Sequence, residues 1–130
     1  MAITQAMCTS FKAELLLGVH DFRPTGDTGA DTFKLALYLD SASIDANTTA
    51  YTASDESSGT NYSAGGSSLN NLGVVASNTN ASAGTGFVDF SDLTFSNVTV
   101  NAAGALIYNS TPSTNSNANT ALTNAAVCVL

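Results

Sequence analysis

The chain has 130 residues, of which 44% are hydrophobic and only 10% charged, and its net charge is −7 with no Lys, Arg or His after Lys34. Nucleic acids and anionic membrane surfaces both attract clustered cationic side chains, so neither is an expected partner. The apolar content is typical of a folded protein. The length is typical of one domain, which we expect to cover residues 1–130.

Residues 1–20 form a separate segment, in which we expect a short helix over residues 10–17. Thr9 or Ser10 can cap its start, and Gly18 stands where a C-terminal glycine belongs. Apolar residues at every fourth position would give this helix one apolar face. That face is expected to pack on the sheet, and docking onto a neighbouring subunit is the alternative. The residues of the face are Met7, Phe11 and Leu15.

The segment over residues 21–31, DFRPTGDTGAD, predicts a turn-rich loop because Pro and Gly interrupt regular structure. Its carboxylates are oxygen ligands of the kind that Ca²⁺ prefers, although their spacing does not match the EF-hand pattern. A calcium site is therefore a minor alternative to a loop of solvated acids, and no other cofactor is expected. The three carboxylates are Asp21, Asp27 and Asp31.

The remainder, residues 32–130, predicts a β-domain whose clearest strand covers residues 32–40. Bulky apolar side chains occupy every second position there, which is typical of a half-buried strand. Shorter strands are expected near residues 50–53 and 69–76, separated by a long loop or a wide hairpin connection. Residues 78–86, NTNASAGTG, have the composition of a second loop. The alternating residues of the first strand are Phe33, Leu35, Leu37 and Leu39.

Alternation resumes over residues 86–90 and continues over residues 93–100, with a change of phase at Ser96 and Asn97 that indicates a bulge or turn. The apolar run at residues 105–108 is typical of a strand buried on both faces. A loop over residues 110–120 and a last strand over residues 125–130 complete the chain. This pattern predicts a mainly β protein, an antiparallel β-sandwich or jelly-roll-like domain with one short N-terminal α-helix.

Catalytic chemistry finds little support in the sequence. His20 is the only histidine, so any Ser-His-Asp or Cys-His site would depend on it. A zinc site could draw only on His20, Cys8 and Cys128, without motif spacing. Neighbouring carboxylates such as Asp55 and Glu56 could in principle serve a glycosidase, but the chain has no Trp, the residue that commonly stacks on sugars. No phosphate-binding glycine motif is present either. We therefore expect no catalytic residue and no enzyme.

The two cysteines and the N-terminus bear on the compartment. Cys8 and Cys128 could be joined in an oxidising compartment, but two buried free thiols are the expected state. The N-terminal residues lack the positive region and the uninterrupted apolar stretch of a signal peptide, and no apolar run approaches the ~20 residues of a membrane span. Synthesis and assembly in the cytosol are expected.

Four segments carry a further signal: AITQAMCTSFKAELLLGVHDF (residues 2–22), DTFKLALYLDSASIDANTTAYT (31–52), YSAGG (62–66) and FVDFSDLTFSNVTVNAAGALIYNST (87–111). They resemble a family of small virion structural proteins encoded in the structural gene modules of tailed bacteriophages. The resemblance spans nearly the whole chain and contains no catalytic signature. It implies a β-rich domain in a virion that is assembled in the cytoplasm of the host bacterium.

The resemblance leaves the place in the particle open. A capsid decoration or cement protein is the first expectation, and a tail or fibre component is the alternative. Implied partners are copies of the chain itself and either the major capsid protein or tail proteins. Outside the resemblance, a carbohydrate-binding adhesin module or an accessory domain of a secreted enzyme remains as a competing hypothesis.

The resemblance also suggests where subunits meet. The family continues past the strand that reads AVCVL here, so this strand would be extended by further chain or completed by another subunit, because an unpaired apolar edge invites aggregation. A surface of Ser, Thr and Asn suits dense assembly, since few charges need to be desolvated. We expect the helix face and the last strand to contact other copies, through Met7, Phe11, Leu15, Val127, Val129 and Leu130.

Overall fold

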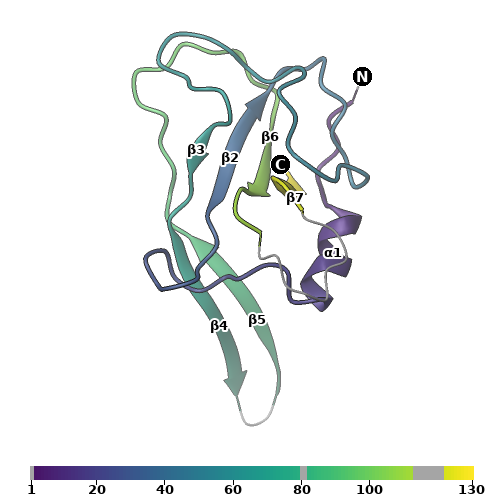
Figure 1. Cartoon of the computed structure of the whole chain (residues 1–130), viewed down its shortest axis with the longest axis vertical. Helices are drawn as coiled ribbons and strands as arrows, with labels where there is room; N and C mark the ends of the chain where they lie inside the picture. The colour runs from purple at the N-terminus through teal and green to yellow at the C-terminus, as the bar shows by residue number, and fades with distance from the viewer. Residues whose placement is uncertain (1, 80–81, 113–121) are drawn as a thin grey trace.

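The computed structural model describes residues 2–79, 82–112 and 122–130 and is mainly β, with antiparallel pairing throughout and one short helix (Figure 1). The predicted fold class is therefore confirmed. In these residues no helix combines the length and the apolar character needed to cross a bilayer. The elements are β1 (Ala6–Met7), α1 (Thr9–Leu16), β2 (Phe33–Tyr38), β3 (Ser67–Ser68), β4 (Asn71–Thr79), β5 (Ser82–Phe90), β6 (Gly104–Asn109) and β7 (Ala125–Val129).

The main sheet has five strands in the order β1-β7-β6-β2-β3. β6 lies in its centre, and Leu106 opposes both Ala36 of β2 and Val129 of β7. The predicted apolar strand is thus confirmed as interior, with Leu106 at 0% and Tyr108 at 2% exposure. β7 is paired on both sides, because the two-residue strand β1 covers its outer side through Met7 opposite Cys128. Further chain or another subunit, which was expected to complete this strand, is therefore not needed for its pairing.

β2 has buried residues on both of its faces, near its start on one face and near its end on the other. The alternation predicted a single buried face. Ala36 and Tyr38 are fully buried on the face covered by the loop after β2, where the Tyr38 hydroxyl donates to the Thr52 carbonyl oxygen at 2.6 Å. On the same face Tyr51 stacks on Tyr108, with ring centroids 4.7 Å apart. The loop after β2 thus takes the place that a second sheet would occupy.

The other face of β2 holds an aromatic cluster centred on Phe33, which is 1% exposed. Phe33 stacks on Phe22 at 4.4 Å and lies 5.7 Å from Phe90. Phe11 of α1 meets Phe22 edge-on at 6.0 Å. The helix, the loop over residues 21–31, the sheet and the root of β5 therefore share one core.

The helix is close to its predicted bounds, but its details differ. Cys8, and not Thr9 or Ser10, is the N-cap, because the chain leaves β1 in extended conformation and the Cys8 N–H donates to Val127. Gly18 ends the helix as predicted, with φ of +71° and its N–H donating to Leu15. The helix packs on the sheet through Phe11 and Glu14, which are its buried residues. The expectation that the whole apolar face packs there is confirmed only for Phe11, because Met7 lies in β1 and is 51% exposed and Leu15 is 47% exposed.

The second sheet is the hairpin of β4 and β5, which projects away from the body (Figure 1). The predicted loop over residues 78–86 is wrong, because β4 continues to Thr79 and β5 begins at Ser82; residues 80–81 lie outside the described part. The strands predicted over residues 93–100 are replaced by irregular chain around a turn, in which Asn97 has φ of +56°.

Two further predictions concern connections. The strand predicted near residues 50–53 is reduced to a single bridge between Ala50 and Ala125. The long connection over residues 54–68 is confirmed as largely irregular and ends in β3. The predicted loop over residues 110–120 lies mostly outside the described residues.

Candidate assembly surface

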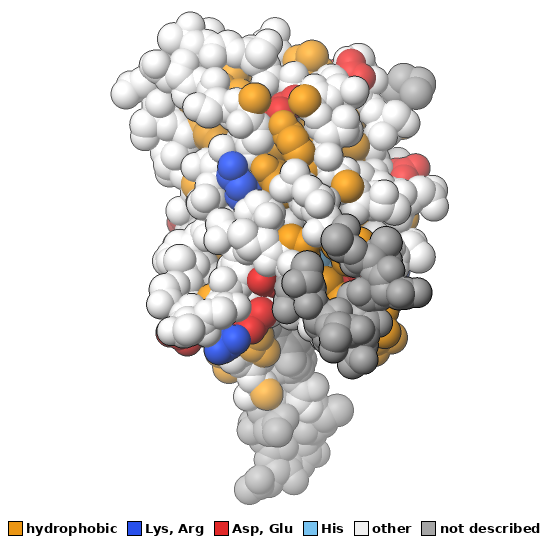
Figure 2. All heavy atoms as spheres, viewed as in Figure 1, with side chains coloured by type: hydrophobic (Ala, Val, Ile, Leu, Met, Phe, Trp, Pro, Cys, Tyr) orange, Lys and Arg blue, Asp and Glu red, His pale blue; other side chains and the backbone are white. Residues whose placement is uncertain are grey.

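Exposed large hydrophobic residues are concentrated in one region of the molecule. In the described residues there are ten, of which nine lie on β1, on α1 with the residue that follows it, or on the hairpin. Figure 2 shows how sparse charged side chains are on the face that it presents, where uncharged groups dominate. We call the nine residues the apolar surface: Met7, Leu15, Leu16, Leu17, Leu72, Val74, Val75, Phe87 and Val88.

An open groove runs between the helix side and the hairpin side of this surface. Its volume is about 360 Å³, and seven of its eight lining residues have apolar side chains. The eighth is Gly86, where an added Cβ would meet nothing within 4 Å. The groove can therefore hold an apolar side chain from another molecule. Its lining residues are Met7, Phe11, Leu15, Phe22, Val74, Gly86, Phe87 and Val88.

The hairpin register explains why apolar side chains appear on both of its faces. Val74 opposes Val88, and the next pair along is Val75 with Phe87. Neighbouring residues of a strand point to opposite faces, so the two pairs lie on opposite sides of the ribbon. Val74 and Val88 of one side line the groove, and Phe87 also reaches its lining, whereas Val75 does not. Val75 and Phe87 are 51% and 45% exposed.

The root of the hairpin is fixed to the loop over residues 21–31. The Thr25 N–H donates to the Asn71 carbonyl oxygen at 3.0 Å, and the Asn71 N–H donates to the Thr25 hydroxyl at 2.8 Å. Gly73 has φ of +100°, and a Cβ there would lie 3.0 Å from Pro24. Glycine at this position therefore lets the ring of Pro24 pack against the strand, which sets the direction in which the hairpin leaves the body.

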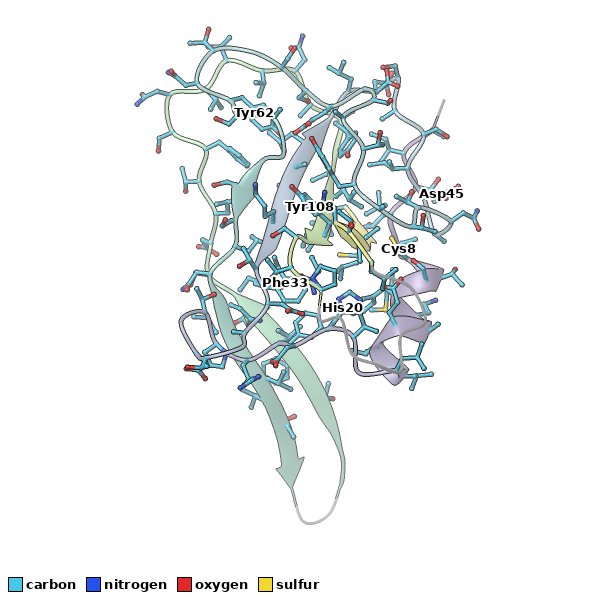
Figure 3. The ribbon with its side chains drawn as sticks, in the orientation of Figure 1. Cys8, His20, Phe33, Asp45, Tyr62 and Tyr108 are labelled. Atoms are coloured by element: carbon cyan, nitrogen blue, oxygen red, sulfur yellow. The ribbon has the colours of Figure 1, made fainter. Side chains whose placement is uncertain are left out.

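A buried polar network supports the helix side of the groove. Figure 3 shows His20 between α1 and the sheet, where its Nε2 lies 2.7 Å from Glu14 Oε2 and its Nδ1 lies 3.0 Å from Asn109 Nδ2. The Asn109 amide also donates to Asp31 Oδ2 at 2.7 Å, while its oxygen accepts the Thr111 N–H. Because this amide donates to Nδ1, the ring proton lies on Nε2 and is donated to Glu14. Both ring nitrogens are thus engaged in holding α1 to the end of β6.

A second network surrounds the buried carboxylate of Glu56. Its Oε2 accepts the Tyr51 hydroxyl at 2.6 Å, and its Oε1 accepts the Tyr62 hydroxyl at 2.8 Å and the Gly65 N–H at 2.7 Å. Burial, followed by the interaction with Glu56, raises the pKa of the Tyr51 hydroxyl above its ordinary value. Tyr108 closes the network by donating to the Gly65 carbonyl oxygen at 2.7 Å. The YSAGG segment therefore stabilises the body of the molecule through its hydrogen bonds in this network.

Two of the three acids of the loop over residues 21–31, Asp21 and Asp31, accept hydrogen bonds from protein donors. Arg23 donates to both carboxylate oxygens of Asp21, and these hydrogen bonds lower the pKa of Asp21. Asp31 accepts the Asp21 N–H and the Asn109 amide, and Asp27 N–H donates to the Pro24 carbonyl oxygen. Within the described residues no group of three His, Cys, Asp or Glu side chains could hold a metal ion. The calcium alternative gains no support.

Both cysteines are free, as expected, but only Cys8 is buried, whereas Cys128 is of intermediate exposure. Cys8 is buried, and burial together with nearby Cys128 raises the pKa of its thiol to about 11. Its Sγ lies 3.9 Å from the Asp45 carbonyl oxygen. The thiolate that disulfide exchange requires is therefore strongly disfavoured at Cys8.

The structure separates the residues that were predicted to form an interface. Met7 and Leu15, at 51% and 47% exposure, belong to the apolar surface. Phe11 lines the groove but is only 4% exposed and is mainly a core residue. Val127 and Val129 are 8% and 1% exposed because β7 is an interior strand, so the prediction that they contact other copies is wrong.

Leu130 and the hairpin complete this comparison. Leu130 is 47% exposed but lies outside the apolar surface, next to Ala105, with which it exchanges two backbone hydrogen bonds. The hairpin residues of the surface were not predicted. The adjacent pairs Val74-Val75 and Phe87-Val88 were the available signal, because two neighbouring apolar residues place one on each face of a strand.

Comparison of this chain with protein-family models, with curated proteins and with solved structures finds no match. The role of the apolar surface is therefore argued from its own chemistry. That chemistry is an open apolar groove beside an apolar hairpin, with the His20 network holding the helix side of the groove to the sheet.

Proposed function

We propose that this chain is a structural component of a tailed-phage virion, most simply a capsid decoration or cement protein on the particle surface. The observation that carries the proposal is the apolar surface, with exposures that reach 89% at Leu16. Soluble monomers rarely expose large contiguous apolar patches, and larger patches mark interaction sites. The resemblance of four sequence segments to small virion proteins supplies the context of the particle.

The rest of the molecule suits a subunit that contacts its neighbours. Charged residues are only 10% of the chain, so contacts desolvate few charges. The two polar networks are buried and hold the body together, and the proposal assigns no catalytic role to His20, both of whose ring nitrogens have partners. The proposed partners are copies of the chain and the major capsid protein.

Particles that contain this chain test the proposal directly. A copy number comparable with that of the major capsid protein, and density on the head in a particle map, is the expected result. A copy number comparable with that of tail proteins, with density on the tail, would favour the tail or fibre alternative. Absence of the chain from purified particles would contradict both.

A matched pair of variants connects the surface to incorporation. Leu16→Asp places a charge on the most exposed residue of the apolar surface, whereas Ser43→Asp adds the same charge at an exposed loop position. We expect Leu16→Asp to reduce incorporation into particles at least tenfold and Ser43→Asp to leave it unchanged. Equal incorporation of both variants would show that the apolar surface is idle.

A further inference from the structure

The outer part of the hairpin lacks a cover within the described chain. β4 and β5 pair only with each other there, and Val75 and Phe87 are half exposed on one face while Val74 is 64% exposed on the other. A two-stranded hairpin is at best marginally stable in water without packing. Hairpin and groove together therefore require an apolar partner that reaches both of them.

The size of the apolar surface matches one side of a standard interface. With roughly 150–200 Å² for a fully exposed large residue, the exposed fractions of its nine members, taken over both faces of the hairpin, amount to about 800 Å². A partner that covers both faces would therefore bury the area that each side contributes to a stable complex. No additional region of the molecule is needed to complete such an interface.

The charges in this region favour a second copy over a different partner. Asp89 is the only charged residue from Asn71 to Phe90, so two chains of net charge −7 can approach here with little repulsion. On α1, Lys12 is exposed and belongs to neither of the two ion pairs of the described residues. Lys12 and Asp89 have opposite charges, so this region has no excess of either charge that would select a strongly basic or a strongly acidic partner over a second copy.

We infer that a second copy of this chain covers the apolar surface, forming a two-fold dimer in which each hairpin packs against the groove and hairpin of its partner. A two-fold contact uses the same patch on both subunits, so the hairpin and the groove of one copy are both satisfied at once. The inference deepens the proposed function, because it names the partner of the same apolar surface. It rests on the proposed function only in that both use this surface.

Light scattering and sedimentation equilibrium of the full chain measure the assembly. The wild type is expected to have twice the mass of one chain at high concentration and to dissociate on dilution. Val75→Asp, on the hairpin face away from the groove, is expected to have the mass of one chain, and Ser43→Asp to remain a dimer. A wild type with the mass of one chain at every concentration overturns the inference, as does a folded Val75→Asp that remains a dimer.

Hydrogen exchange of the wild type gives a second readout that needs no variant. Amides over residues 74–77 and 84–88 are expected to exchange at least tenfold more slowly in the concentrated than in the dilute sample. Protection confined to other residues would place the dimer contact elsewhere and overturn the inference. If the chain is monomeric in solution but occurs in purified particles, the dimer is refuted and the proposed function stands. If the chain is a dimer but is absent from particles, the proposed function is refuted and the dimer stands.

Discussion

The central strand β6 and the hairpin strands β4 and β5 use similar apolar residues in opposite ways. In β6, Leu106 and Tyr108 are at most 2% exposed, and neighbouring strands pair with both edges. In the hairpin, Val74 and Phe87 are 64% and 45% exposed, and each strand has one edge without a strand partner in the described chain. Apolar residues in a strand therefore indicate burial without saying whether the same molecule or another one provides the cover.

The largest expected effect contrasts a glycine of the body with one of the hairpin. Gly66 has φ of +69°, and a Cβ there would lie 1.8 Å from the Leu35 carbonyl oxygen, so Gly66→Ala should cost at least ~4 kcal/mol of unfolding free energy or prevent folding. Gly86→Ala meets nothing within 4 Å and should change stability by less than ~1 kcal/mol. Urea unfolding of both variants measures this. Equal losses would contradict the packing described for the turn at Gly66.

Two phenylalanines provide the next contrast. Phe33 is 1% exposed in the aromatic cluster, so Phe33→Ala should lower the free energy of unfolding by about 3–5 kcal/mol. Phe87 is 45% exposed, and Phe87→Ala should lower it by no more than ~1 kcal/mol in dilute solution. Urea unfolding at dilute and concentrated protein checks both values. A large loss at Phe87 in dilute solution would mean that the hairpin belongs to the core.

Substitutions of two asparagines compare the contribution of the buried polar network to stability with that of an exposed hydrogen bond at the root of the hairpin. Asn109→Leu removes the amide from His20 and Asp31 while both stay buried, and should cost about 2–3 kcal/mol. Asn70→Leu removes only an exposed hydrogen bond to Ser91 and should cost less than ~1 kcal/mol. Thermal unfolding, followed by circular dichroism, measures the difference. Similar melting temperatures for the two variants would refute the role assigned to the network.

The smallest effect near neutral pH comes from the tyrosines of the body, which the hairpin lacks. Burial raises the pKa of Tyr38 to about 12 and also raises those of Tyr51, Tyr62 and Tyr108. The unfolded chain loses these protons first, near pH 10, so stability is fully present below about pH 10 and falls as the pH rises through the native pKa values.

Ultraviolet absorbance of the phenolate measures this effect. No phenolate should appear in the folded chain near pH 10, and its appearance should coincide with unfolding at higher pH. Tyr51→Phe is the control, because it removes one titrating group and should leave the remaining titration abrupt. Free titration of all four tyrosines near pH 10 in the folded state would contradict the burial described.

Much of the body could be predicted from the sequence, for reasons that specific residues make clear. The alternation around Phe33 and the apolar run ending at Tyr108 predict β2 and β6, because side chains that are buried on the faces of a sheet are mostly apolar. The two-residue strand β1 could not be predicted, because Ala6 and Met7 carry no strand pattern of their own. This is why further chain or another subunit was expected to complete β7.

The hairpin and the apolar surface were harder to predict. Residues 78–86 have the composition of a loop, and their strand structure depends on pairing across the hairpin, which local propensity does not contain. The groove depends on the packing of Pro24 on Gly73, a contact between segments far apart in the sequence. The helical spacing of Met7 and Leu15 predicted a face that packs on the sheet, and only the docking alternative placed them on a surface, whereas both are about half exposed. Their neighbours on the hairpin were not predicted.

The hydrogen bonds between Thr25 and Asn71 and the close contact at Gly73 join the hairpin to the body at its base. Farther along the hairpin, residues 74–77 and 84–88 are exposed and contribute little to the core. Sequence changes in this outer stretch alter what the molecule presents without altering what keeps it folded. The outer hairpin is thus where substitutions are expected to be tolerated best, because the contacts that hold the body together do not involve it.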